Sequence, residues 1–124
     1  MDLTSGLRFV EAMERAVGTG DRSAAERHLS GDIVYTVGAR PPLRGVDAVL
    51  VAIAEQGRRV RWDGHTFRDA WLGEDALVIE VESHFTRVAD GRRISLPCTD
   101  IYRFKEGRIG DWRVYADMSP FEAP

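Results

Sequence analysis

The chain has 124 residues, of which 44% are hydrophobic and 30% are charged, so it has the size and composition of one globular domain with one core. Its formal net charge of −3 and its scattered arginines form no basic stripe, which argues against nucleic acid as a partner. The single cysteine, Cys98, excludes an internal disulfide, and the three well-separated histidines complete no zinc motif with it.

Membrane and targeting signals are also missing from the sequence. No run of about 18 apolar residues predicts a membrane span, and the first residues lack the basic flank and apolar block of a signal peptide. We therefore expect a cytoplasmic protein whose residues 1–124 form one domain. No repeat or linker interrupts that domain, and we expect it to act without a cofactor or a metal.

The first half of the chain predicts three helices and one strand. Apolar residues recur at three- and four-residue spacing over residues 4–17 and 46–58, as on one face of an amphipathic helix. A short capped helix is predicted over residues 22–29. Residues 32–37 are rich in β-branched and aromatic types and predict a strand, whereas two adjacent prolines predict a loop over residues 38–45.

The second half predicts four strands joined by glycine-containing turns, over residues 60–72, 76–88, 92–104 and 108–117. Helices followed by a run of strands are typical of the α+β class. We expect a cone-shaped, curved antiparallel sheet, a cystatin-like α+β barrel, with the three helices of the N-terminal half packed on its concave face. The open end of such a cone is a natural pocket.

The strand predicted over residues 92–104 carries the strongest candidate for chemistry, Asp100. Alternate residues of this strand form a face that is apolar except for one carboxylate: Ile94, Leu96, Cys98, Asp100, Tyr102 and Phe104. Burial raises the pKa of a carboxyl group, so Asp100 could donate to an oxyanion or remove a proton next to a carbonyl. The alternative is an outward-facing Asp100 that pairs with Arg103 or Arg113.

Two other polar residues have competing interpretations. Asp117 follows the last strand and could lean over the mouth of the cavity, or it could cap the backbone of residues 118–119. His84 lies on the less apolar face of its strand, which directs it away from the core. It enters the pocket only if a β-bulge shifts the register, and there it would form an acid/base couple with Asp100.

Aromatic and sulfur-containing residues are candidates for substrate binding. The hydroxyl groups of Tyr35 and Tyr102 could donate to a substrate oxygen, and Cys98 is interpreted as a small buried hydrophobe. Four further residues could line an aromatic slot: Trp62, His65, Phe67 and Trp71. The alternative for these aromatic residues is a place in the core or in a dimer interface.

Two short motifs carry a resemblance to a known superfamily. A Leu-Arg-Gly loop at residues 43–45 precedes the third helix, and a Gly-Arg-Ile turn at residues 107–109 leads to a closing Tyr-Ala-Asp at residues 115–117. Together with the order of the elements, these motifs resemble the nuclear transport factor two superfamily over residues 7–117. Within it, the chain is most similar to the SnoaL-like polyketide cyclases, the ketosteroid isomerases and the limonene epoxide hydrolases.

The resemblance implies roles for individual residues. Asp100 falls where ketosteroid isomerases place the aspartic acid of their oxyanion hole, and near the acid/base aspartate of the cyclases. Asp117 falls at the water-activating aspartate of the epoxide hydrolases and Tyr35 at their water-holding tyrosine, but Val37 replaces their asparagine. Met13 falls near the isomerase tyrosine and cannot donate a proton, so we retain it as a substrate contact.

Three functional hypotheses follow. The first is a small cofactor-free enzyme that binds an apolar, carbonyl-bearing substrate, such as a polyketide intermediate, and cyclises or isomerises it with Asp100 as acid/base, assisted by Asp117, His84 or Tyr35. The second is a non-catalytic module that binds a small ligand or a partner, and the third is epoxide-hydrolase-like water addition. The resemblance also implies a homodimer through a sheet face, which Trp71 and Trp112 could mark.

Overall fold

The computed structural model describes residues 1–124. The predicted helices and strands are all present, close to their expected ends: α1 (Leu3–Thr19), α2 (Arg22–His28), β1 (Leu29–Val37), β2 (Leu43–Arg44), α3 (Val46–Arg59), β3 (Val60–Leu72), β4 (Ala76–Arg87), β5 (Arg93–Lys105), β6 (Arg108–Tyr115) and the 3₁₀ turn η1 (Ser119–Phe121). The segment predicted as a loop contains the two-residue strand β2, which pairs with β1. None of the helices combines the length and apolar character needed to cross a membrane.

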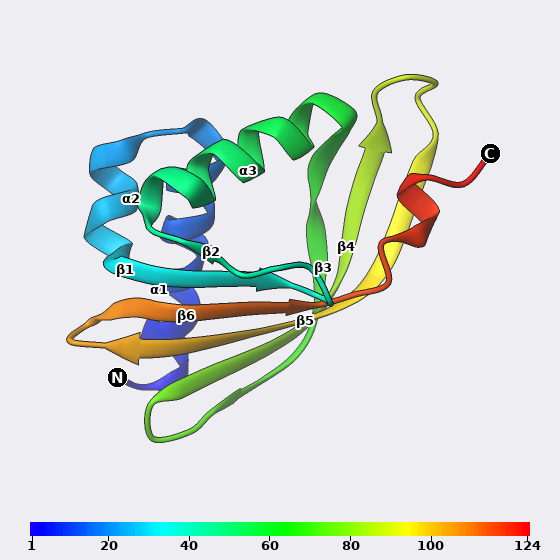
Figure 1. Cartoon of the computed structure of the whole chain (residues 1–124). Coiled ribbons are helices and arrows are strands. Elements are labelled where there is room, and N and C mark those ends of the chain that lie inside the picture. The colour runs from blue at the N-terminus through cyan, green and yellow to red at the C-terminus, as the bar shows by residue number, and fades with distance from the viewer.

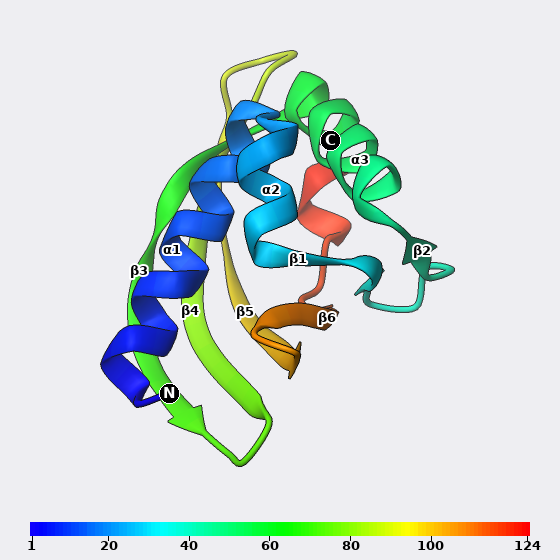
Figure 2. The same cartoon turned by 90° about the vertical axis from the view of Figure 1, so that its left-hand side faces the viewer.

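Helix α1 forms because its ends are capped and one of its faces is apolar. The Asp2 carboxylate accepts a hydrogen bond from the Ser5 amide at 2.8 Å, and Gly20 ends the helix with a left-handed φ of 71°. Its buried side includes Val10 and Met13 and packs against the sheet. Figure 2 shows that α1, α2 and α3 all lie on the concave side of the curved sheet.

The sheet has six strands in the order β2-β1-β6-β5-β4-β3. Strands β3 to β6 form an antiparallel meander, whereas β1 runs parallel to β6, which makes the sheet mixed. The sheet is strongly curved but does not close on itself (Figure 1). The expected α+β fold, with helices on the concave face of a cone-shaped sheet, is confirmed.

Strand β3 contains two β-bulges that determine which of its side chains face inward. Its register against β4 shifts between Trp62 and Gly64 and again between Phe67 and Asp69. Gly64 adopts a φ of 104°, which residues with a side chain rarely adopt. The first bulge puts three positions, instead of two, between the inward residues Trp62 and His65, and Phe67 follows two positions later. All three side chains therefore lie on the concave face.

The core has two parts. The larger part lies between the helices and the sheet, and a smaller cluster lies near the C-terminus and consists of Val60, Phe85, Ile94, Leu96 and Phe121. The rings of Phe85 and Phe121 meet edge to face with their centroids 4.8 Å apart. Arg87 donates hydrogen bonds to the carbonyl oxygens of Phe121, at 3.3 Å, and Ala123, which hold the C-terminal segment against β4.

Candidate active site

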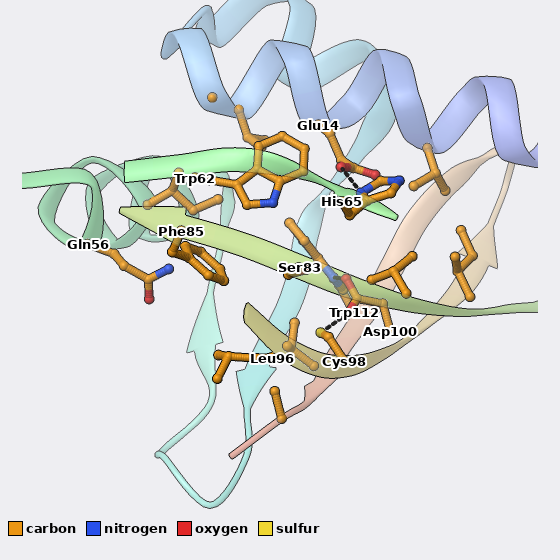
Figure 3. A pocket seen from close by; sticks show the side chains of 18 of the residues that line it. Glu14, Gln56, Trp62, His65, Ser83, Phe85, Leu96, Cys98, Asp100 and Trp112 are labelled. Carbon is orange, nitrogen blue, oxygen red and sulfur yellow. Dashed lines mark hydrogen bonds and ion pairs between the residues drawn. The ribbon is translucent and has the colours of Figure 1, made fainter. Parts of the chain in front are cut away.

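A cavity of about 600 Å³ lies between the helices and the concave face of the sheet. Of the 27 residues that line it, 18 are hydrophobic, and they come from α1, α3 and every strand except the short β2, with Ala116 and Met118 from the segment after β6. Figure 3 shows its polar side chains converging on the same space from α1, β3 and β5. Such a cavity suits a small apolar ligand with a few polar groups.

Asp100 lies on the inner face of β5, and its carboxylate receives three hydrogen bonds from side chains. The Tyr102 hydroxyl and the Trp112 Nε1–H donate to Oδ2 at 2.9 and 3.2 Å, and the Cys98 thiol donates to Oδ1 at 3.1 Å. Asp100 forms no ion pair with Arg103 or Arg113, so the outward-facing alternative is wrong. The three donors fix the orientation of the carboxylate at the floor of the cavity.

Burial and hydrogen bonding act in opposite directions on Asp100. Burial raises its pKa above the ordinary aspartate value, while the hydrogen bonds from Cys98, Tyr102 and Trp112 lower it, because they favour the ionised form. The pKa values of the Cys98 thiol and the Tyr102 hydroxyl are themselves raised, first by burial and then by the charge of Asp100. Both groups therefore keep their protons and remain donors to Asp100.

A second carboxyl group, Glu14 on α1, lines the same cavity opposite Asp100. Its Oε2 lies 3.8 Å from Nδ1 of His65 on β3, and the two side chains are only 19% and 26% exposed. Burial, followed by the nearby charge of Asp100, raises the pKa of Glu14 to about 8. Glu14, His65 and Asp100 thus form a polar group within a mostly apolar space (Figure 3), and the exposed Glu11 also belongs to the lining.

Sequence reasoning missed Glu14 and assigned His65 only to an aromatic slot. A signal for Glu14 was available, because it lies four residues after Val10 and three before Val17, at the edge of the buried stripe of α1. The signal for His65 was weaker, since a regular strand would alternate and only Gly64 marks the bulge that turns His65 inward.

Several predicted binding residues do line the cavity. Tyr35 lies against Trp112 with ring centroids 4.4 Å apart, and its pKa is raised, first by burial and then by the charge of Asp100. The other predicted residues on the lining are Tyr102, Cys98, Trp62 and Phe67. Trp62 and Phe67 stand on the edge strand β3, so they face the cavity and are also reached by solvent.

Trp71, which was predicted for the aromatic slot, is 53% exposed and does not line the cavity. Three further predicted site residues are also not part of the cavity lining. His84 is on the outer face of β4, where its ring nitrogens hydrogen-bond Thr66 and Ser95 at 2.8 Å each, because β4 alternates regularly against β5 and the bulges occur in β3 instead. Met13 is 0% exposed and belongs to the core between α1 and the sheet. The predictions of a pocket-facing His84 and of a substrate-contacting Met13 are therefore wrong.

The third of these residues is Asp117, which caps the local backbone. It is exposed, and its carboxylate accepts a hydrogen bond from the Ser119 amide at 3.0 Å, which lowers its pKa. Tyr35 lines the cavity whereas Asp117 does not, so the two cannot hold one catalytic water between them. This separation argues against water addition by the epoxide hydrolase mechanism.

The chemistry available to the cavity is proton transfer. No group of three or more histidine, cysteine, aspartate or glutamate side chains is arranged to hold a metal ion. Burial raises the pKa of both Asp100 and Glu14, and that of Glu14 reaches about 8, so two cavity carboxyl groups have pKa values above their ordinary range.

Solved structures with the same fold bear names from several reaction classes. A protein from Jannaschia sp. CCS1, provisionally named a SnoaL-like polyketide cyclase, superposes with a TM-score of 0.82 at 14% identity, over 98% of this chain and 94% of that one. A protein from Rhodopseudomonas palustris, provisionally named an isomerase, gives 0.80 at 22% identity, over 98% and 96%. An LEH-like epoxide hydrolase from M. tuberculosis gives 0.74 at 21% identity, over 96% and 87%.

These similarities establish the fold and leave the reaction open, because one fold supports many functions. No curated protein matches the sequence. The family model described as a SnoaL-like domain matches residues 9–112, which include every strand of the sheet at least in part. The chain therefore belongs to the SnoaL-like domain family.

Proposed function

We propose that the protein is a small cofactor-free enzyme that binds an apolar, carbonyl-bearing substrate in its cavity and isomerises or cyclises it by acid/base chemistry at Asp100. One observation carries this proposal: a buried carboxylate, oriented by three side-chain donors, lies at the floor of a mostly apolar cavity of about 600 Å³. A carboxyl group in such surroundings can take a proton from a carbon next to a carbonyl.

In the proposed reaction, an oxygen of Asp100 accepts the proton from that carbon, and the electron pair of the broken C–H bond moves toward the carbonyl group. Asp100 then returns the proton to a different carbon in an isomerisation. In a cyclisation, the carbon nucleophile attacks a second carbonyl of the same molecule, which the cavity walls hold nearby, and the alkoxide oxygen that forms takes the proton back from Asp100. Cys98, Tyr102 and Trp112 are positioning residues, because they hold the carboxylate that performs the transfer.

The names of the structural neighbours support this reaction class without deciding between its members. Polyketide cyclisation and the isomerisation of a ketone through its enol both begin with removal of a proton next to a carbonyl, and a cyclase name and an isomerase name occur among the proteins of similar fold. Non-catalytic ligand binding in the same cavity is the alternative.

Exchange of carbon-bound protons tests the proposal without knowledge of the natural substrate. The probe is 2-tetralone, an apolar bicyclic ketone, incubated in D₂O and followed by proton NMR. The wild-type protein should accelerate loss of the proton signal next to the carbonyl, and Asp100→Asn should reduce the acceleration by at least about 100-fold. Asp117→Asn is the matched control, since it changes an exposed carboxylate outside the cavity.

An Asp100→Asn protein that exchanges the ketone at the wild-type rate would disprove the assignment of Asp100. A wild-type protein that binds 2-tetralone, as measured by a shift in melting temperature, but does not exchange its protons would favour the non-catalytic binding module.

We also propose that the protein forms a homodimer through the outer face of the sheet. On this face, Trp71 and Tyr115 are 53% and 50% exposed. Trp71 on β3 pairs with Val78 on β4, and Val78 pairs with Ile101 on β5, so these apolar residues form a row across the sheet toward β6. Trp112 is not available for this contact, because it faces the cavity. Light scattering after size-exclusion chromatography should give twice the monomer mass for the wild type and the mass of one monomer for Trp71→Glu. A monomeric wild type would refute the dimer.

A further inference from the structure

We propose that Glu14, positioned by His65, is a second catalytic group that protonates the carbonyl oxygen of the substrate from the helix side of the cavity, while Asp100 removes the carbon-bound proton from the sheet side. This inference rests on the proposed function and adds an acid to it. It also restricts the substrate to a ketone whose oxygen can reach α1 while its acidic carbon reaches β5.

The placement of the two carboxyl groups is the first argument. Glu14 extends from α1, which covers the concave face, and Asp100 extends from β5, which forms part of that face. Both line the one cavity, and Figure 3 shows Glu14 with His65 on the α1 side and Asp100 with Cys98 on the β5 side. A flat substrate in the cavity would therefore have one carboxyl group above it and one below it.

The difference in hydrogen bonding is the second argument. Asp100 accepts hydrogen bonds from three side chains, whereas no side-chain or backbone donor hydrogen-bonds Glu14, whose nearest ionic partner is His65 at 3.8 Å. Hydrogen bonds to a carboxylate favour its charged form. Asp100 is therefore the carboxyl group that ionises first, and its charge then helps Glu14 to keep its proton.

The other charges near Glu14 preserve this division. Titratable or charged groups approach it from three elements: Glu11 and Arg15 on α1, His65 on β3, and Cys98, Asp100 and Tyr102 on β5. Burial, Asp100 and Glu11 all raise the pKa of Glu14, and only Arg15 lowers it. The hydrogen bonds make Asp100 the better base of the pair and leave Glu14 the acid, which is the arrangement that enolisation of a ketone requires.

The step balances without any further reactant. The C–H bond next to the carbonyl breaks and its proton passes to an oxygen of Asp100, while its electrons form the new C=C bond. The π electrons of the C=O bond take the proton of Glu14, so that an enol and a Glu14 carboxylate result. In the second half of an isomerisation, the enol O–H proton returns to Glu14 and Asp100 delivers its proton to another carbon.

His65 is a positioning residue in this scheme. It reaches Glu14 only because the bulge at Gly64 turns it to the concave face. Its Nδ1 lies 3.8 Å from Oε2 of Glu14, so the imidazole ring limits the positions that this carboxyl group can take, but no proton of the reaction passes through His65.

The test is the pH profile of 2-tetralone exchange. Because Glu14 must be protonated, the wild-type rate should fall as the pH rises through about 8. Glu14→Gln should lower the rate by about 100-fold and abolish that fall, and Glu14→Asp should restore part of both. His65→Gln should lower kcat more than it changes KM, and its rate should still fall as the pH rises through about 8. His84→Gln, on the outer face, is the matched control and should behave as the wild type.

A second measurement does not depend on turnover. In protein with ¹³C-labelled glutamate side chains, the Glu14 carboxyl signal should titrate near pH 8, and its midpoint should fall in Asp100→Asn because the neighbouring charge is removed. A midpoint near the ordinary value of 4.5 would overturn the inference.

The possible failures can be told apart. If Glu14→Gln keeps the wild-type rate and profile while Asp100→Asn is inactive, the role of Glu14 is wrong and the proposed function stands. If Asp100→Asn keeps the wild-type rate, the proposed function is wrong, and a wild-type protein that does not exchange the ketone overturns both.

Discussion

Asp100 and Glu14 share one cavity but stand in different hydrogen-bonding environments. Burial raises the pKa of both groups. Asp100, on a regular strand, receives three side-chain hydrogen bonds, whereas Glu14, on a helix opposite a bulged strand, receives none. Burial alone therefore does not assign acid and base roles, because the donors around each group decide which of the two ionises first.

The largest expected effect comes from replacing the ionisable carboxyl group of Glu14 by an amide. Its pKa is about 8 in the folded state and near 4.5 in the unfolded chain, so its contribution to stability is complete below pH 4.5 and is lost as the pH rises toward 8. At pH 7 this costs on the order of 3 kcal/mol. Glu14→Gln should therefore raise the free energy of unfolding in urea at pH 7, with little change at pH 4.

The control for that variant is Glu55→Gln, which changes an exposed carboxylate on α3 outside the cavity lining. It should alter stability by less than about 0.5 kcal/mol at either pH. Equal effects of the two variants would mean that Glu14 is not buried in solution as the structure describes. The expected outcome, a more stable protein with weaker exchange activity, is the usual relation between stability and function at an active site.

Removing one donor from Asp100 should make its environment resemble that of Glu14. Tyr102→Phe deletes the hydroxyl that donates to Oδ2 at 2.9 Å, which should cost about 2 kcal/mol in urea unfolding at pH 7. With fewer donors to its charged form, Asp100 should have a still higher pKa. The exchange rate should rise with pH as Asp100 ionises, and this acidic limb of the pH profile should therefore move to higher pH. Tyr115→Phe, on the exposed face, should leave that limb unchanged.

The bulge that supplies His65 can be perturbed at Gly64. An alanine there must adopt a φ of 104°, and no neighbouring atom lies within 4 Å of the added carbon, so backbone strain is the main cost. Gly64→Ala should destabilise the protein by about 1 kcal/mol and should reduce the rate of exchange by displacing His65. Gly31→Ala, at an open position without a positive φ, is the control. A wild-type rate in Gly64→Ala would show that His65 tolerates the distortion.

The smallest effect is expected at Asp117. Its carboxylate caps the Ser119 amide outside the cavity, so Asp117→Asn should keep ketone exchange within about twofold of the wild-type rate. A loss as large as that of Asp100→Asn would mean that the C-terminal segment folds over the cavity during the reaction.

The sequence predicted the part of the site that lies on regular structure. Asp100 could be placed because β5 pairs with β4 without a register shift, so counting by two from Leu96 gives the correct face. Strand alternation also predicted that His84 points outward, and the structure confirms it. The alternative, in which a β-bulge in β4 turns His84 into the cavity, is wrong. The three-helix, curved-sheet fold was predictable because the helical and strand periodicities are uninterrupted.

The remaining part depends on features that one sequence does not display. His65 faces inward because of the local insertion between Trp62 and Gly64 in β3, and a bulge changes the face of the residues that follow it in the strand. Met13 and Glu14 are neighbours in the chain, but one residue of an α-helix turns by about 100°, which sends Met13 to the core and Glu14 to the cavity. Asp117 lies beyond the end of β6, where strand periodicity no longer applies.

The position of β6 has a consequence for how the protein is made. It is the last strand in the chain, yet it lies between β1 and β5 in the sheet, and Leu29 pairs with Ile109 across that junction. Strands β1 and β2 therefore cannot join the meander until residues 108–115 have left the ribosome. Such distant pairing makes folding slow and leaves the early helices without the β1–β6 junction in the meantime. The cavity and its two carboxyl groups are completed only when the final strand arrives.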